Sequence, residues 1–178
     1  MKLAPKAALA LLAALSIAAP AAAGEPPAAG AKAPAFTLPS QDGFTVSLEQ
    51  YKGRWVVLYF YPKDFTSGCT LEAHNFQRDL AKYEKANAVI LGVSLDSVDS
   101  HKDFCTKEGL GFRLLSDAGK TATAAYGSLV TSPERVIAAR NTFLIGPDGV
   151  VRKVFLKVNP SVHSDEVLAA LAELQAKK

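Results

Sequence analysis

The chain has 178 residues, 20 lysines and arginines against 17 aspartates and glutamates, a net charge of +3 and 49% hydrophobic residues, which suits one ordinary globular domain. Its two cysteines exclude a four-cysteine zinc site and a framework of several disulfides, since two thiols form at most one bridge. The mild charge, with no run of basic residues, gives no electrostatic footprint for nucleic acid.

The first 23 residues have the pattern of a secretory signal peptide. Two lysines precede an apolar stretch over residues 7–19, and three alanines stand just before Gly24 as small residues for cleavage. The apolar stretch is shorter than the roughly 20 residues needed to span a bilayer. We therefore expect cleavage, export to the periplasm and no membrane span. A retained interfacial helix or a lipid anchor is disfavoured, because no cysteine follows the cleavage site.

Residues 24–34 are rich in Pro, Ala and Gly and are expected to form a flexible lead-in to a single domain over residues 35–178. The domain opens with two short alternating segments, 36–38 and 44–48, whose intervening Ser-Gln-Asp-Gly turn predicts an antiparallel hairpin. The continuous apolar run Trp55–Tyr61 then predicts a central strand buried on both faces.

Helical and strand patterns alternate from there to the end of the chain. Apolar residues recur at intervals of three and four from Cys69 to Tyr83, which predicts an amphipathic helix, and the run 88–95 predicts a second buried strand parallel to the first. The remaining predictions are, in order, a helix from about Ser97 to Glu108 ended by Gly109, a strand over 112–115, a helix over 118–126, a hairpin of 142–145 and 150–156, and a helix over 165–176. The pattern predicts an α/β fold, a mixed sheet with helices on both faces.

The densest chemical signal is the segment from Pro62 to Cys69, between the first buried strand and the first helix. At a helix N-terminus the unpaired backbone N–H groups and the macrodipole favour an anion, so they favour the thiolate form of Cys69. Thr66 adds a hydroxyl three residues earlier, Gly68 lets the backbone approach closely, and Pro62 can cover the site without presenting an N–H. The segment therefore predicts an activated cysteine nucleophile.

The string Pro62-x-x-x-Thr66-x-x-Cys69 resembles the active-site motif of the peroxiredoxins, and the resemblance extends from residues 35–38 to Arg140–Ile145. The chain most resembles the peroxiredoxin Q, or bacterioferritin-comigratory-protein, branch. This resemblance implies a thioredoxin-like fold, Cys69 as the peroxidatic cysteine, and a peroxide pocket completed by Pro62, Thr66 and Arg140.

Two positions depart from the pattern of that branch. Ser67 stands where many members have proline, and His74 where many have a resolving cysteine; other members carry that cysteine on the next helix, where Cys105 falls, 36 positions after Cys69. The resemblance therefore implies an atypical two-cysteine enzyme, whose Cys69 sulfenic acid is resolved by Cys105 as an intramolecular disulfide and recycled by a thioredoxin-like dithiol. We expect hydrogen peroxide and organic hydroperoxides as substrates, no metal or other cofactor, and a monomer.

The chemistry also sets two structural expectations. Negative charge moves from sulfur to the leaving oxygen, so donors must follow it; the candidates are the guanidinium of Arg140, the hydroxyl of Thr66 and the backbone N–H groups of Gly68 and Cys69. A disulfide requires Cα atoms within about 7 Å. Unless the two cysteines already touch, one of their helices is expected to unwind locally in each cycle.

Three alternatives stay open on the sequence alone. The two cysteines could form one structural disulfide in a non-catalytic exported domain, or serve a thiol–disulfide oxidoreductase of the same fold, although that chemistry ordinarily uses Cys-x-x-Cys. The two cysteines with His74 and His101 could also form a zinc site, but His74 lies about 140° around the helix from Cys69. His74 and His163 are expected to be solvated, and Glu72 to be solvated or paired.

Overall fold

The structure is a computed structural model that describes residues 24–177. The predicted signal peptide, residues 1–23, lies outside the described residues. No helix within the described part of the chain is long and apolar enough to cross a membrane.

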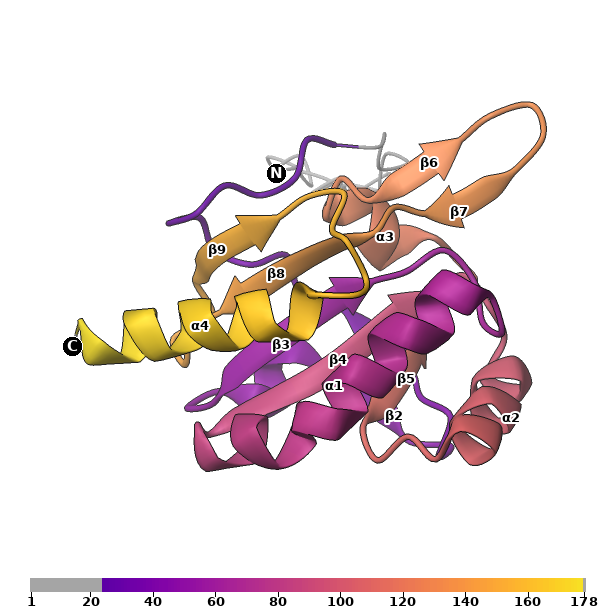
Figure 1. Cartoon of the computed structure of the whole chain (residues 1–178). Helices are drawn as coiled ribbons and strands as arrows, with labels where there is room; N and C mark the ends of the chain where they lie inside the picture. The colour runs from indigo at the N-terminus through magenta and orange to yellow at the C-terminus, as the bar shows by residue number, and fades with distance from the viewer. Residues whose placement is uncertain (1–23, 178) are drawn as a thin grey trace, which may run out of the picture.

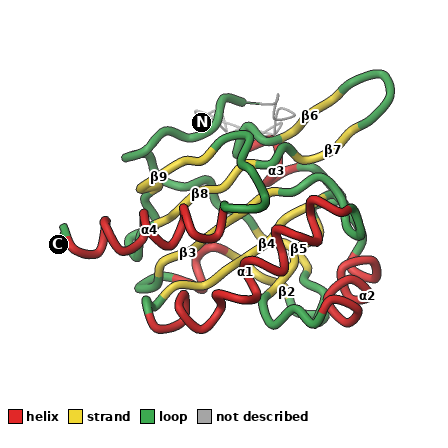
Figure 2. Tube along the Cα trace, viewed as in Figure 1, coloured by secondary structure: helices red, strands yellow, loops and turns green. Residues whose placement is uncertain are grey.

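A mixed sheet forms the centre of the domain (Figures 1 and 2). Its five strands lie side by side in the order β5 (Arg113–Ser116), β4 (Ala88–Ser94), β3 (Trp55–Phe60), β8 (Asn141–Ile145) and β9 (Val151–Phe155). β3 pairs in parallel with β4 and antiparallel with β8, which itself pairs antiparallel with β9. The predicted central strand, the parallel step through a helix and the late hairpin are therefore confirmed.

The helices that accompany the sheet are α1 (Ser67–Lys85), α2 (Val98–Glu108), α3 (Thr121–Ala125), α4 (His163–Ala176) and the short 3-10 helix η1 (Leu48–Tyr51). A separate antiparallel hairpin of β1 (Thr37–Pro39) and β2 (Thr45–Ser47) matches the one expected at the start of the domain. In Figure 1, α1 and α4 lie across the same face of the sheet.

The residues of β3 alternate between two apolar cores, because successive side chains of a strand point to opposite faces. Odd-numbered residues such as Tyr59 join the core under α1, α2 and α4. Even-numbered residues such as Phe60 join a second core with α3, η1 and the β1–β2 hairpin. All six side chains of β3 are buried, which explains its continuous apolar sequence. The predicted α/β architecture with helices on both faces is confirmed.

The helix that carries Cys105 begins and ends where its sequence predicts. The Ser97 hydroxyl accepts the N–H of Ser100 at 3.2 Å, and Gly109 ends α2 with φ of 65°, the left-handed conformation that glycine adopts without strain. In contrast, α3 is shorter than the predicted 118–126. Its N-cap is Lys120, whose φ of 61° is left-handed, so the helix starts only at Thr121, where the carboxylate of Asp117 accepts the backbone N–H groups of Thr121 at 3.0 Å and Thr123 at 2.6 Å.

Two parts of the fold differ from the expectations. Residues 30–33 of the lead-in run beside β9, where the Gly30 N–H donates to the Val151 carbonyl at 2.8 Å and the Ala33 N–H to the Gly149 carbonyl at 2.9 Å. These residues of the lead-in are therefore attached to the edge of the sheet, an attachment that a composition rich in Pro, Ala and Gly does not predict. The sequence also gave no sign of the antiparallel hairpin formed by β6 (Leu129–Thr131) and β7 (Val136–Ala138).

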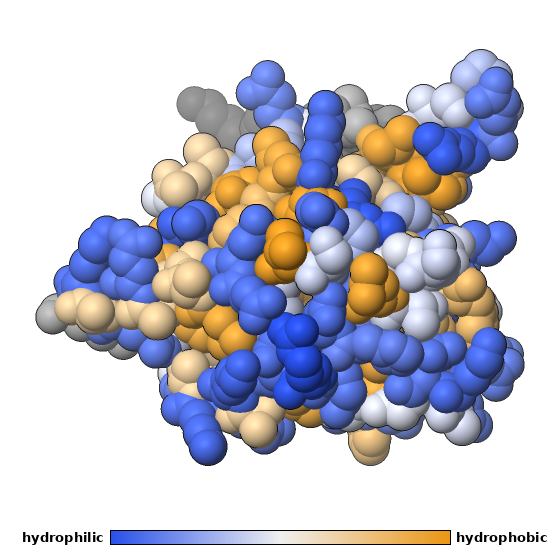
Figure 3. Space-filling model, in the orientation of Figure 1, coloured by the Kyte–Doolittle hydropathy of each residue, from blue (hydrophilic) through white to orange (hydrophobic). Residues whose placement is uncertain are grey.

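The helices α1 and α4 are amphipathic, with one face toward the core and the other toward solvent. Figure 3 shows this face largely covered by hydrophilic side chains, with hydrophobic residues scattered between them. The apolar residues of both helices instead point inward, as Phe76 and Leu171 do. Packing against the sheet, therefore, holds the N-terminus of α1 in place beyond the end of β3.

Candidate active site

Cys69 is the third residue of α1 and only 2% exposed. The sheet ladder reaches Tyr61, whose N–H donates to the Val93 carbonyl at 3.0 Å, and the half-buried Pro62 then starts the loop that leads into the helix. Because the helix begins right after this loop, the sulfur sits in the first turn, where backbone N–H groups lack helical partners. The strand–loop–helix placement predicted for the nucleophile is confirmed.

Arg140 reaches the sulfur of Cys69 from the segment between β7 and β8. Its Nη2 donates to the Cys69 Sγ at 3.3 Å, although the two residues lie 71 positions apart. Its Nη1 is paired with Glu72 Oε2. A permanently charged guanidinium that donates to sulfur favours the anionic form of that sulfur and remains available to a developing oxyanion.

Gly68 leaves the space that the guanidinium occupies. A Cβ atom at this position would lie 3.3 Å from Arg140 Nη2 and 3.8 Å from Pro160 Cγ. A contact of 3.3 Å is tighter than most side chains accept, so an added methyl group would displace the guanidinium by a few tenths of an ångström. The close approach predicted for Gly68 is therefore an approach to Arg140.

Glu72 fixes the other side of that guanidinium. The carboxyl group lies one helical turn after Cys69 and is 1% exposed. Burial raises the pKa of Glu72 to about 7, against the opposing effect of Arg140, and its Oε1 atom lacks a hydrogen-bond partner within residues 24–177. Of the two states expected for Glu72, the paired one is observed, and the solvated one is not.

Thr66 stands at the N-cap of α1 with an extended backbone. Its hydroxyl donates to the Lys63 carbonyl at 3.0 Å, and its side chain is exposed. A hydroxyl has one proton to donate and two lone pairs that accept. Donation to a bound peroxide therefore requires the hydroxyl to rotate away from Lys63.

Cys105 lies in the last turn of α2, 8% exposed, and joins the same apolar core as Cys69. Its backbone carbonyl accepts the N–H of Leu110 at 3.0 Å. Burial, followed by the charges of Asp64 and Asp42, raises the pKa of the Cys105 thiol to about 12. Both cysteines are free thiols, so the structure represents the dithiol form.

The histidines are placed differently from the sequence expectation. His163 is fully buried, with Nε2 2.8 Å from Thr142 Oγ1, and burial lowers its pKa to about 4; the expectation that it is solvated was wrong, because a helix-start histidine looks like a surface residue in sequence. His74 is half exposed and pairs with Glu108 at 2.9 Å. Within residues 24–177 no group of three or more His, Cys, Asp and Glu side chains is placed to hold a metal ion.

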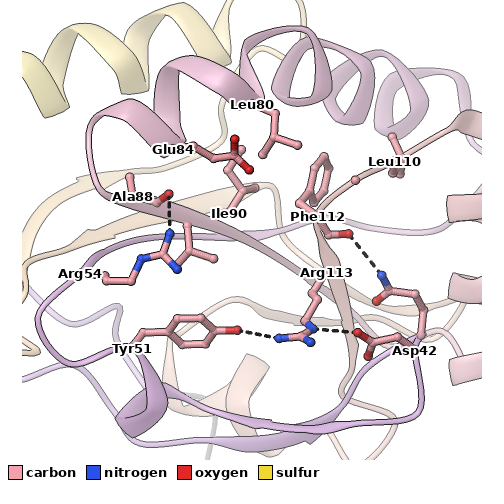
Figure 4. A pocket seen from close by; sticks show the side chains of 13 residues that line it. Asp42, Tyr51, Arg54, Leu80, Glu84, Ala88, Ile90, Leu110, Phe112 and Arg113 are labelled. Atoms are coloured by element: carbon pink, nitrogen blue, oxygen red, sulfur yellow. Dashed lines mark hydrogen bonds and ion pairs between the residues drawn. The ribbon is translucent and has the colours of Figure 1, made fainter.

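A cavity of about 360 Å³ lies at the amino ends of β4 and β5, whereas Cys69 follows the carboxyl end of the parallel strand β3. Figure 4 shows that the two arginines of its lining, Arg54 and Arg113, are engaged by other groups of the protein. Arg113 donates to Asp42 Oδ2 at 2.9 Å and to the Tyr51 hydroxyl at 3.4 Å, and Arg54 donates to the Ala88 carbonyl at 3.3 Å. This cavity is separate from the cysteine site.

Together the fold and the site define a thioredoxin-like α/β enzyme that works through a cysteine nucleophile. The AhpC/TSA family matches residues 29–154. The chain is 44% identical to a putative peroxiredoxin bcp of Coxiella burnetii, over 80% of this chain and 97% of that protein, and 43% identical to peroxiredoxin Bcp of Xanthomonas campestris, over 78% and 91%. The chain therefore belongs to the AhpC/TSA family, as a peroxiredoxin of the Bcp and peroxiredoxin Q type.

Solved structures agree with this assignment. Peroxiredoxin Q of Xanthomonas campestris superposes with a TM-score of 0.74 at 40% identity, covering 78% of this chain and 90% of that one. A mutant of Xylella fastidiosa PrxQ superposes with a TM-score of 0.81 at 34% identity, covering 85% and 99%. The protein is a thiol-dependent peroxidase, which decides against the non-catalytic domain and the disulfide oxidoreductase left open by the sequence.

Proposed function

We propose that the protein reduces hydrogen peroxide and organic hydroperoxides through Cys69, resolves the product with Cys105, and is recycled by a thioredoxin-like dithiol. The observation that carries this proposal is the guanidinium of Arg140, whose Nη2 lies 3.3 Å from Cys69 Sγ. The organic substrates are supported by a relative, because structures of the bacterioferritin comigratory protein of Xanthomonas campestris concern its alkyl peroxide reduction activity.

In the first step the Cys69 thiolate attacks one oxygen of the hydroperoxide. A sulfur–oxygen bond forms, the O–O bond breaks, and the other oxygen leaves with the electron pair as alkoxide or hydroxide, which takes up a proton. Sulfur is oxidised by two electrons to the sulfenic acid and the peroxide is reduced to an alcohol or water. Pro62 borders the loop, and the Thr66 hydroxyl and Arg140 are the donors proposed for the leaving oxygen.

Ionisation of the nucleophile alone is too small an effect to account for an enzyme. An ordinary thiol is roughly 3% ionised at pH 7, so complete ionisation raises its rate about thirtyfold, or about 2 kcal/mol, whereas enzymatic acceleration starts at about 8 kcal/mol. The larger share has to come from donors that are already oriented when charge reaches the leaving oxygen. The pairing of Arg140 with the buried Glu72 provides that orientation.

In the second step Cys105 attacks the sulfenic sulfur, a disulfide forms and water leaves. An external dithiol then reduces the disulfide and becomes oxidised itself. Relatives support the pairing, because two solved structures of Xanthomonas campestris peroxiredoxin Q carry a cysteine-to-serine replacement at one or other of two positions that are 36 residues apart. Cys69 and Cys105 have the same separation.

Local unwinding accompanies this second step in our proposal. Cys69 Sγ is engaged by Arg140 and both thiols are free, whereas a disulfide needs the sulfur atoms about 2.05 Å apart. We therefore expect the sulfur of Cys69 to leave Arg140 and the start of α1 or the end of α2 to deform when the disulfide forms. Crystal structures of the reduced and oxidised protein would test this, and superposable structures with both helices unchanged would contradict it.

Peroxide consumption with a dithiol reductant tests the assignment of the nucleophile. Cys69→Ser is expected to abolish consumption, because it removes the thiolate that donates its electron pair to the peroxide oxygen. Cys105→Ser is the matched control with the same atom exchange, and it should still consume one equivalent of peroxide before recycling stops. Multiple turnovers by the Cys69→Ser protein would refute the assignment.

We also propose that the protein is exported after cleavage before Gly24 and works as a monomer. Export is supported by the family match, which starts at residue 29, after the signal-like segment. The monomer is supported by the presence of both cysteines of the cycle in one chain. N-terminal sequencing of the protein from the periplasm should find Gly24 first. An N-terminus that still begins with Met1 would contradict cleavage. Light scattering should give the mass of one chain, and the mass of a dimer would contradict the monomer.

A further inference from the structure

The loop that precedes Cys69 is fastened to the helix of Cys105 through Asp64. This carboxylate is 3% exposed and accepts three hydrogen bonds. Tyr61 donates its hydroxyl at 2.7 Å, and from α2 Ser100 donates its hydroxyl at 2.7 Å and His101 its Nδ1 at 2.8 Å. A carboxylate with several charge-assisted or hydroxyl donors is a strong attachment point. Asp64 thus joins the two segments that carry the two cysteines.

The carboxylate of Asp64 is the nearest hydrogen-bond partner of the His101 side chain. The ring is fully buried, its Nδ1 also lies 3.2 Å from the Tyr61 hydroxyl, and its Nε2 has no partner among residues 24–177. His101 precedes Cys105 by four residues, so the two share one face of α2. The peroxide chemistry described above uses neither His101 nor Asp64. Their contact therefore calls for another role.

Phe65 shows that the same loop is held under strain. Its backbone φ is 60°, a conformation that costs energy for a residue with a Cβ atom and that persists only where the surroundings impose it. Its ring packs edge-on against the buried Phe104 with centroids 5.1 Å apart, and Lys107 lies over it at 5.4 Å. Release of this loop from α2 would relieve the strain, whereas the contacts of Asp64 maintain it.

Electrostatics around Asp64 agree with the geometry. Although burial raises its pKa, the hydrogen bonds from His101, Ser100 and Tyr61 bring the pKa of Asp64 below its ordinary value, so the group is an anion in the folded protein. That charge lies close enough to Cys105 to raise the pKa of its thiol further. Burial first, and then the charge of Asp64, keep Cys105 protonated in the folded protein.

We propose that Asp64, held by Ser100 and His101, is a positioning residue that keeps the peroxidatic loop on α2 and must release before Cys105 reaches Cys69. This inference rests on the proposed role of Cys105 as the resolving cysteine. The strength of the hydrogen bonds between Asp64 and α2 sets the lifetime of the Cys69 sulfenic acid. It thereby sets the partition between the disulfide and a second oxidation by peroxide to the sulfinic acid.

The experiment follows both sulfurs of the reduced full chain after rapid mixing with hydrogen peroxide, by acid quenching and mass spectrometry. Asp64→Ala is expected to speed disulfide formation about tenfold or more, since a hydrogen bond to a charged group corresponds to at least a factor of ten. Ser100→Ala removes one of the three donors and should give an increase of a few fold. In excess peroxide both variants should accumulate less sulfinic acid, because the sulfenic acid lives for a shorter time.

Asp103→Ala is the matched control, because it truncates an exposed acid on the same helix. It should leave the rate and the partition unchanged. An unchanged or slower disulfide step in both Asp64→Ala and Ser100→Ala would overturn the proposal. If Asp64→Ala fails to fold, as judged by circular dichroism, Ser100→Ala decides alone, since it removes one hydroxyl from a partly exposed position.

A second measurement separates this proposal from the role of Cys105. If the wild-type protein forms no disulfide between Cys69 and Cys105, the resolving role fails, and hydrogen exchange of the reduced protein then tests the attachment. Ser100→Ala should speed exchange in residues 63–69 and 98–105 together, whereas Asp103→Ala should not. Unchanged exchange in both segments would show that Asp64 does not couple them.

Discussion

Both cysteines are buried, but their electrostatic surroundings are opposite. Cys69 lies in the first turn of a helix and receives an N–H of a permanently charged guanidinium at 3.3 Å. Cys105 lies in the last turn of a helix, near the carboxylate of Asp64, and the pKa of its thiol is raised to about 12. Burial is the largest cause of the raised pKa of Cys105, and the nearby carboxylates add to it, whereas the buried sulfur of Cys69 has a cationic donor beside it.

This difference also orders the catalytic cycle. Arg140 and the helix N-terminus prepare Cys69 in the folded protein, so peroxide meets a sulfur that is already activated. In the cycle that we propose, Cys105 becomes a nucleophile only when its surroundings change, so that resolution follows the first oxidation.

Alkylation measures the contrast directly. A thiol whose pKa is about 12 is ionised to roughly one part in 10⁵ at pH 7, about a thousandfold less than an ordinary thiol. We therefore expect iodoacetamide to label Cys105 at least about a thousandfold more slowly than a free cysteine, and to label Cys69 first. Peptide mass spectrometry of the reduced protein gives both rates, with the urea-unfolded chain as the control. Equal labelling of the two cysteines in the folded protein would contradict the account.

Arg140→Met should slow the oxidation of Cys69 by about 10² to 10³, the usual cost of one oriented donor on a developing oxyanion. The substitution also leaves Glu72 buried without its partner, so stability should fall by about 3–5 kcal/mol. The double variant Arg140→Met/Glu72→Gln separates the two effects, because it should regain stability but not rate. Arg152→Met, at an exposed ion pair with Asp148, is the control in stopped-flow measurements. A loss of less than tenfold in both Arg140 variants would exclude the guanidinium as a major donor.

Glu72 makes stability depend on pH. Its folded-state pKa of about 7 lies above the 4.5 of an unperturbed glutamate, so the folded state binds its proton more tightly than the unfolded state does. That contribution is fully present below pH 4.5 and is lost as the pH rises through 7, which amounts to on the order of 3 kcal/mol. Wild type should therefore lose this much stability relative to Glu72→Gln between pH 4.5 and 8.

Urea unfolding at several pH values measures that difference, and the buried His163 affects both proteins alike and cancels. Glu173→Gln, at an exposed carboxylate on α4, is the control, and the stability of wild type relative to this variant should stay constant over the same pH range. A difference between wild type and Glu72→Gln that stays constant with pH would contradict the burial of Glu72 as a titrating group.

Gly68→Ala is expected to have the smallest effect. It should raise the stability and lower the activity. Alanine favours a helix over glycine by up to about 1 kcal/mol, but its Cβ would lie 3.3 Å from Arg140 Nη2. The protein should become slightly more stable while peroxide reduction slows a few fold. Gly119→Ala, where the nearest side-chain atom is 4.0 Å away, is the control. An unchanged rate in the Gly68 variant would show that the guanidinium position is not critical.

Local patterns made much of this fold predictable from the sequence. The buried strand β3, the helix that Cys69 leads and the Gly109 end of α2 each depend on residues that are close together in the chain. The short hairpin β6–β7 and the pairing of residues 30–33 with β9 could not be predicted in this way. Their strands are short or lack alternation, and their place depends on which backbone groups the rest of the sheet leaves free.

The site divides along the same line. Cys69 follows from a strand–loop–helix pattern, whereas Arg140 was reached only through the family resemblance, because a polar contact across 71 residues leaves no periodicity. The attachment of Asp64 to His101 spans 37 residues and had no signal at all. The depth of His163 was missed for the same reason, since periodicity detects apolar faces and not polar groups that are satisfied inside a core.

The most direct test of the central claim is to expose the reduced protein to one equivalent of hydrogen peroxide, quench it within milliseconds and locate the oxygen by peptide mass spectrometry. We expect one oxygen to appear first on Cys69, and this species then to convert to a Cys69–Cys105 disulfide. Oxidation that starts at Cys105, or peroxide consumed while Cys69 stays a free thiol, would contradict it.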